Sequence, residues 1–124
     1  MKLLAGLFAL MLATALATFW FSRRAADEVA CDTRDLAQSV SPDQQAQADL
    51  FEVRCGDSLT THVALRAPLA PAYSRSDVFV AIGSLALRLA WPGPRELVIE
   101  SPQARVLVAE TRWRAIGVKI RQGR

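Results

Sequence analysis

The chain has 124 residues, of which 52% are hydrophobic and 22% are charged, with six glycines and six prolines. This length allows one domain rather than two, and the composition excludes a disordered or collagen-like chain. The formal net charge is +3, but Lys2, Arg23 and Arg24 carry all of it because acids and bases cancel from residue 25 onwards. A folded part without net charge lacks the broad cationic surface that nucleic-acid binding needs, so we expect no nucleic-acid partner.

The first element is an apolar segment, residues 3–21, which contains no charged side chain. As a helix it would span about 28 Å, close to the roughly 30 Å hydrocarbon core of a bilayer. Phe19-Trp20-Phe21 would then lie at the membrane interface. We therefore predict a membrane anchor over residues 1–24. A cleaved signal peptide is the alternative, because Lys2 can serve as its basic start and Ala15-Leu16-Ala17 as its cleavage site, near Ala17.

A polar tether is predicted over residues 25–34, and it contains the first of two cysteines. Cys31 and Cys55 enclose 23 residues. This spacing favours a structural disulfide, which would stabilise the folded state by roughly 3–4 kcal/mol. Two unrelated buried thiols are the alternative. Two cysteines and one histidine cannot complete a four-ligand zinc site, so we expect no metal. A disulfide needs an oxidising compartment. This places the folded part in the periplasm, either anchored in the inner membrane through residues 3–21 or released there by cleavage.

Residues 35–124 form the predicted domain, and their hydrophobic pattern has a period of two. The clearest run places Leu85, Leu87, Leu89 and Trp91 on one face. Turns containing proline separate the runs, and no amphipathic helix lies between them. We predict an all-β fold, a single antiparallel meander of about six to eight short strands that forms a small barrel or a sandwich-like pair of layers. The predicted strands cover residues 46–54, 62–66, 78–82, 85–91, 96–100, 105–109 and 115–121.

His62 is the single histidine and the candidate for acid–base chemistry. It follows Asp57 and Ser58 in the same stretch, which makes a small hydrolase-type enzyme the alternative interpretation of function. The sequence has no Gly-x-Ser-x-Gly motif and no glycine-rich phosphate loop. We therefore expect a protein that is not an enzyme, with no catalytic residues and no cofactor.

Aromatic side chains in two turns are the candidate contact surface. Trp113 stands between Arg112 and Arg114, a cluster that can stack on a base, a sugar or a partner side chain. The alternative for this cluster is a hairpin tip whose indole packs on the sheet. Tyr73 lies in the longest irregular stretch, residues 67–77, which contains two prolines.

Several short motifs occur in a fixed order: Cys31, Ser41-Pro42-Asp43, Cys55-Gly56, Thr61-His62-Val63, Trp91, Leu97-Val98-Ile99 and Gly117-Val118-Lys119-Ile120-Arg121. In this order they resemble a domain-of-unknown-function family of small secreted or membrane-anchored bacterial proteins. The chain departs from the family at Gln44, where the family has glycine, and at residues 57–59, where the family has a loop of small residues. The resemblance implies a Cys31–Cys55 pair and one compact β domain, and it implies no activity.

Together these observations predict a non-enzymatic envelope protein, held at the inner membrane with its β domain in the periplasm. We expect it to bind another envelope component through residues 67–77 or residues 112–114. A purely structural role without a ligand is the alternative that the sequence leaves open.

Overall fold

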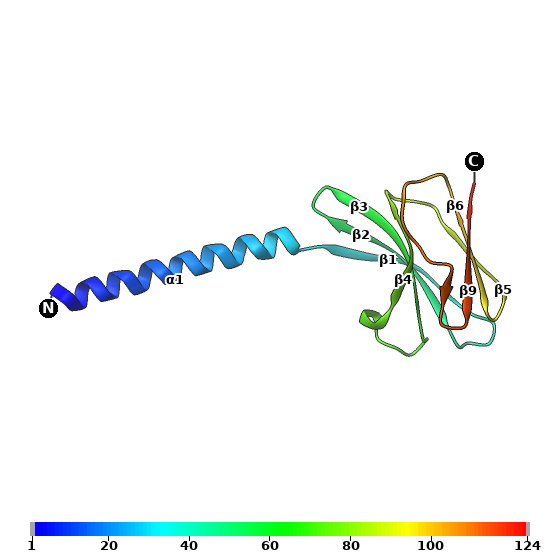
Figure 1. The fold of residues 1–124 in the computed structure, drawn as a ribbon, viewed down its shortest axis with the longest axis horizontal. Helices are drawn as coiled ribbons and strands as arrows, with labels where there is room; N and C mark the ends of the chain where they lie inside the picture. The colour runs from blue at the N-terminus through cyan, green and yellow to red at the C-terminus, as the bar shows by residue number, and fades with distance from the viewer. Residues whose placement is uncertain (1, 124) are drawn as a thin grey trace. The chain divides into compact units, whose positions relative to one another are not determined.

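The computed structural model describes the backbone of residues 2–123 and the side chains of residues 3–20 and 30–123. Its backbone forms two compact units, one that ends at Cys31 and one that begins at Asp32. The first unit contains helix α1 (Lys2–Val29), and the second is a β domain (Figure 1).

Helix α1 contains a stretch, Leu3–Trp20, that is long and apolar enough to cross a membrane. Thr14 and Thr18 are the polar residues of this stretch. Their hydroxyl groups donate to backbone carbonyl oxygens one turn earlier, Thr14 to Leu10 at 3.0 Å and Thr18 to Thr14 at 2.8 Å. Because each hydroxyl has a partner inside the helix, neither would enter a bilayer with an unpaired donor. A signal sequence would have the same length and composition.

The larger sheet of the β domain, sheet A, holds five strands in the order β1-β2-β3-β4-β7, and all their pairings are antiparallel. Strands β1 to β4 follow one another along the chain as hairpins. In the first hairpin, the amide of Gln44 donates to the carbonyl oxygen of Ser41 at 2.9 Å, which closes the turn predicted around Pro42. The strand bounds are β1 (Asp32–Val40), β2 (Gln47–Cys55), β3 (Ser58–Arg66), β4 (Ser76–Ile82) and β7 (Val106–Ala109).

The smaller sheet, sheet B, holds four strands in the order β5-β6-β9-β8. Their bounds are β5 (Arg88–Gly93), β6 (Glu96–Ser101), β8 (Arg112–Trp113) and β9 (Ile116–Gln122). The chain crosses from sheet A to sheet B at Gly83, whose φ of 98° suits glycine. The buried hydroxyl of Thr61 fastens this crossing, since it donates to the Gly83 carbonyl oxygen at 2.6 Å and accepts from the Leu85 amide at 3.1 Å.

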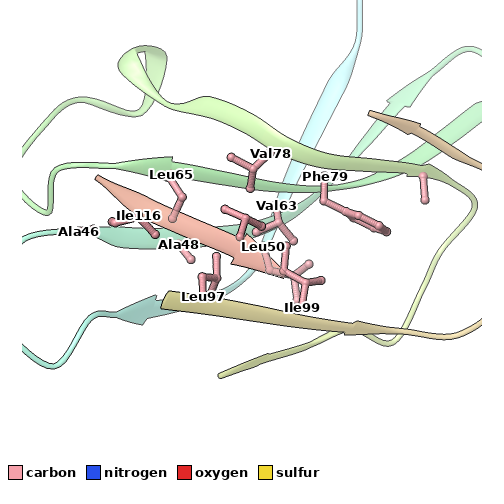
Figure 2. Close-up of a cluster of buried hydrophobic side chains, with 12 residues drawn as sticks. Ala46, Ala48, Leu50, Val63, Leu65, Val78, Phe79, Leu97, Ile99 and Ile116 are labelled. Atoms are coloured by element: carbon pink, nitrogen blue, oxygen red, sulfur yellow. The ribbon is translucent and has the colours of Figure 1, made fainter. Parts of the chain in front are cut away.

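The hydrophobic core lies between the two sheets (Figure 2). Val63, Leu65 and Phe79 of sheet A face Leu97 and Ile99 of sheet B, and all five are fully buried. Burying each of these side chains contributes roughly 2 kcal/mol before the entropy of ordering is subtracted. The predicted inward packing of Leu85, Leu87, Leu89 and Trp91 is confirmed, because all four are partly buried against the core. The strand itself is shorter than predicted, since β5 begins at Arg88 and Leu85 and Leu87 precede it.

The prediction of a mostly β fold after an apolar helix is confirmed, but the single antiparallel meander and the closed barrel are wrong. Two separate sheets pack face to face, and β6 pairs with β9 in parallel. The parallel pair arises because the chain leaves sheet B after β6, adds β7 to the edge of sheet A, and returns through β8. Alternation of apolar residues identifies a strand but does not indicate which strand will pair with it. The passage of the chain from sheet B to sheet A and back was therefore not predictable from the pattern.

The structure also extends the strand content at the start of the domain. Strand β1 begins at Asp32, inside the predicted tether over residues 25–34, and helix α1 continues to Val29. Strand β1 lacks a clear alternation because it lies at the edge of sheet A, where eight of its nine residues are exposed. An edge strand exposed on both faces has no core-facing side to display in its sequence.

Candidate functional site: a loop clamped on sheet A

The outward face of sheet A is buried beside β2. Ala48 and Leu50 point to the core, so Gln47, Asp49 and Phe51 point to the opposite side of the sheet. They are nevertheless only 6%, 2% and 5% exposed. A buried carboxylate on an outward face needs partners that replace water.

Asp49 is held by two arginines that come from opposite ends of one loop. Its Oδ2 lies 2.8 Å from Nε of Arg66, the last residue of β3, and 3.4 Å from Nη1 of Arg75, just before β4. Its Oδ1 accepts from the side-chain amide of Gln47 at 2.8 Å. We call Asp49, Arg66 and Arg75 the clamp. Both carboxylate oxygens therefore have donors, which offsets the cost of burying the charge.

Arg75 also covers an aromatic pair. Its guanidinium carbon lies 3.6 Å from the ring centre of Phe51, a cation–π distance. The Phe51 ring stacks on the imidazole of His62 with centres 4.9 Å apart and planes 19° apart. Asp35 on β1 adds a longer contact, 3.6 Å from Arg75 Nη1. Arg75 thus joins β1, β2 and the chain entering β4.

Between the clamp arginines runs the proline loop, defined here as residues 67–74. Its backbone is held by hydrogen bonds from Ala70 to Ala67 and from Ser74 to Pro71, both 3.0 Å, and it contains the short 3₁₀ helix η1 (Ala72–Ser74). Arg66 Nη1 donates to the carbonyl oxygen of Ala70, so the clamp also reaches the middle of the loop. The proline rings of the loop restrict φ further. A loop with these constraints has little backbone freedom.

Two apolar side chains project from this loop into solvent. Leu69 is 100% exposed and Tyr73 is 90% exposed. Tyr73 is one of the predicted contact residues, and the structure places it on the η1 turn. Leu69 also lines a groove of about 540 Å³ with Val40, Pro42 and Pro68.

The second predicted contact cluster, residues 112–114, is arranged differently. Trp113 is half-buried and packs against the core from β8. Arg114 has a φ of 51° and places its guanidinium carbon 4.5 Å from the indole centre. Arg112 is exposed on the opposite side of the sheet. The indole therefore presents less free surface than Tyr73.

The structure separates His62 from the partners that the sequence suggested. Ser58 stands four residues away on the same strand, which corresponds to about 13 Å. Asp57 lies in the turn between β2 and β3. The groups near the imidazole are instead Thr60, whose hydroxyl is 2.7 Å from Nε2, and Asp77, whose Oδ1 is 3.4 Å from Nδ1.

Thr60, His62 and Asp77 have the order of a hydroxyl, an imidazole and a carboxylate, but their setting lacks the other parts of a hydrolase. Strand β3 lies between β2 and β4, so its amide groups point along the sheet toward those neighbours. No amide of this strand is directed outward to stabilise an oxyanion. Thr60 also lies flat on the strand, without the sharp turn that presents a nucleophile. The arrangement orients the imidazole against Phe51.

The two cysteines are bonded to each other as a Cys31–Cys55 disulfide. The register pairs Asp32 with Arg54, so the bond joins the next two residues at the end of the β1–β2 ladder. Among the described residues, no group of three or more His, Cys, Asp or Glu side chains could hold a metal ion.

Sequence reasoning did not identify the clamp. A signal was present in β2, where Phe51 alternates with Ala48 and Leu50 and therefore marks the outward face as partly apolar. An apolar residue on each face indicates that both faces are covered. The two arginines carry no such signal, because they are 17 and 26 residues from Asp49 in the chain.

Comparisons with protein-family models, with curated proteins and with solved structures find no match for this chain. The resemblance to a domain-of-unknown-function family therefore stays a prediction.

Proposed function

We propose that the chain is a non-enzymatic, membrane-anchored envelope protein whose β domain binds a protein partner through the proline loop. The domain would stand on the periplasmic side of the inner membrane. The apolar stretch Leu3–Trp20 supports the anchor, although a signal sequence has the same properties. The Cys31–Cys55 disulfide supports an oxidising compartment.

The observation that carries this proposal is the contrast between the base of the proline loop and its surface. The base is held by a carboxylate whose side chain is only 3% exposed, while Leu69 and Tyr73 are almost completely exposed. A single exposed apolar side chain is common on protein surfaces and needs no explanation. Two such side chains on one restrained loop can bind a partner protein at a small entropic cost, because the loop backbone is already ordered. Tyrosine is also enriched among the residues that dominate binding energy at protein interfaces.

Site-specific photo-crosslinking in the native host tests this proposal. A photoreactive amino acid placed at Tyr73 should crosslink to one partner protein, and Leu69→Ser should weaken that crosslink severalfold. The matched control places the same amino acid at Gln103, which is exposed in the turn after β6. Equal crosslinking from both positions, or none from Tyr73, would contradict a binding role for the loop.

A further inference from the structure

The outward face of sheet B carries a group of basic side chains. Ile116, Val118 and Ile120 pack toward the core, so Lys119 and Arg121 on the same strand point outward. The register places Arg88 on β5 and Arg112 on β8 on the same side. We call Arg88, Arg112, Lys119 and Arg121 the basic face, and all four are exposed.

The basic face is only partly neutralised within the described part of the chain. The ion pairs between described side chains all lie in sheet A, where they join Asp35, Asp49 and Asp77 to Arg66, Arg75 and His62. On the outward side of sheet B, Glu96 and Glu100 oppose the four bases, which leaves two positive charges in excess. The zero sum of residues 25–124 therefore conceals a separation of charge between the two sheets.

Arg88 and Arg121 flank a hollow of about 390 Å³ at one end of this face. Glu100 lies between them in the register, and Ser101 and Gly123 complete the lining. Guanidinium groups match phosphate oxygens with paired hydrogen bonds. The guanidinium groups of Arg88 and Arg121 can therefore donate hydrogen bonds to phosphate oxygens on either side of Glu100, in addition to the net positive charge of the face.

We infer that the basic face docks on anionic phospholipid headgroups of the bilayer that holds α1. The inference rests on the proposed anchor. Eleven residues, 21–31, separate Trp20 from Asp32, and even a fully extended segment of that length spans less than about 40 Å. The β domain thus stays near the headgroups, where opposite charges attract at short range and a tethered contact has a high effective concentration.

The same face is poorly suited to a protein partner. Val98 lies at its centre but is only 4% exposed, and the other apolar residues on this side, Ala90 and Pro92, are small. Protein interfaces draw their affinity from buried aromatic and apolar side chains. The proline loop on sheet A offers such side chains, whereas sheet B offers charge.

Lys119 gives a direct measurement, because Lys2 and Lys119 are the two lysines of the chain. The full chain is reconstituted in vesicles of phosphatidylcholine alone and of phosphatidylcholine mixed with phosphatidylglycerol. Lys119 is then acylated with an uncharged amine reagent and the modified peptides are quantified. We expect acylation of Lys119 to be at least about threefold slower in the anionic vesicles, because a headgroup contact shields the amine. High salt should restore the rate.

Gln45→Lys provides the matched control, since it introduces a second reporter amine at an exposed position of the β1–β2 turn, at the opposite end of this ladder from the disulfide. That amine should react at the same rate in both vesicles. Arg88→Gln combined with Arg121→Gln should abolish the protection of Lys119. Equal rates for Lys119 in both vesicles, or equal protection of both amines, would overturn the inference.

Flotation of the vesicles separates this inference from the proposed anchor. A chain that does not float with phosphatidylcholine vesicles lacks a stable anchor, which overturns both proposals. A chain that floats but shows no lipid dependence at Lys119 retains the anchor and overturns the headgroup contact alone.

Discussion

Gln44 follows the first hairpin turn of the β domain with a φ of 59°. This left-handed conformation is costly for a residue with a Cβ atom and favourable for glycine. Gly56 occupies the next hairpin turn with a φ of 62°. The two turns therefore impose similar backbone conformations. Gly56 adopts this conformation without strain, whereas Gln44 adopts it at a cost.

We expect Gln44→Gly to stabilise the protein by about 0.5–1 kcal/mol, because relief of the left-handed strain exceeds the added flexibility of the unfolded chain. Urea unfolding of the full chain in mild detergent measures the difference. Gly56→Ala is the reverse control and should cost about 1 kcal/mol, since a Cβ atom there meets nothing within 4 Å and only the backbone is strained. A loss of stability in Gln44→Gly would contradict the assigned strain.

Asp43 in the same turn links stability to pH. The hydroxyl of Ser41 donates to Asp43 Oδ1 at 2.7 Å and lowers the pKa of that carboxyl below its ordinary value of 3.8, against the opposing effect of desolvation. The amide of Gln45 and the charge of Arg95 lower this pKa further. Folding thus favours the ionised form, so the stabilisation is complete above the unfolded pKa and disappears as the pH falls through the lower folded pKa.

Asp43→Asn should therefore lower the melting temperature at neutral pH, and the gap to the natural protein should close as the pH falls below about 4. Thermal unfolding followed by circular dichroism between neutral and acidic pH measures both. If the difference in melting temperature stays constant across this pH range, the loss of stability comes from the shape of the turn and not from the charge of Asp43.

Among the structural elements, β1 and the proline loop depend most on a few contacts. Strand β1 buries little of its surface, so its pairing with β2 and the disulfide at the end of that ladder hold it in place. The proline loop depends in the same way on the clamp, in which Arg66 and Arg75 share one carboxylate.

Asp49→Asn should destabilise the protein by roughly 3 kcal/mol, because it leaves the partly buried Arg66 without its carboxylate and Arg75 with only the exposed carboxylate of Asp35. The side chains of the two arginines are only 13% and 17% exposed. Asp35→Asn is the control, since that carboxylate is 71% exposed, and it should cost less than about 1 kcal/mol. Urea unfolding measures both variants. Equal effects would show that Asp49 acts as an ordinary surface charge.

Cys31→Ser should lower stability by about 3 kcal/mol through the freedom regained by the unfolded chain. The double variant with Cys55→Ser should be no less stable than either single variant. Hydrogen exchange should accelerate in β1 and remain slow in β3, which is buried between two neighbouring strands. Two free thiols in protein isolated from an oxidising compartment would contradict the bond.

The molecule as a whole combines an apolar segment, a disulfide and a β domain whose charges are divided between its two sheets. In the proposed arrangement the domain lies outside the cytoplasm, in an oxidising compartment where the disulfide would form. The charge division would then give each sheet its own contact, a protein at the proline loop and headgroups at the basic face.

A reporter that fluoresces only in the cytoplasm, fused after Arg124, should therefore stay dark. The same fusion without residues 1–24 is the control and should be bright. The mass of the isolated protein distinguishes the two membrane interpretations, because cleavage near Ala17 removes the apolar segment. A bright fusion of the full chain would exclude the periplasmic location.

Local patterns were sufficient to predict seven of the nine strands, β2 to β7 and β9, because a buried face imposes its period on a few neighbouring residues. Ile116, Val118 and Ile120 are an example, since each packs toward the core. Strand β1 escaped prediction because its exposed edge position imposes no such period. Tyr73 was singled out as a candidate contact residue from its proline-rich surroundings, whereas Leu69 was not.

The sequence by itself determined the apolar helix, the strand positions and the spacing of the two cysteines, since each depends on residues close together in the chain. The tertiary structure alone decided which strands are neighbours, and with them the clamp and the basic face. Asp49 meets Arg75 only because β2, β3 and β4 pair as they do in sheet A. Arg88 and Arg121 share one face only because β5 and β9 both pair with β6 in sheet B. Such contacts depend on which strands pair and in which register. Packing across both sheets decides this pairing, and no single segment of the sequence contains that information.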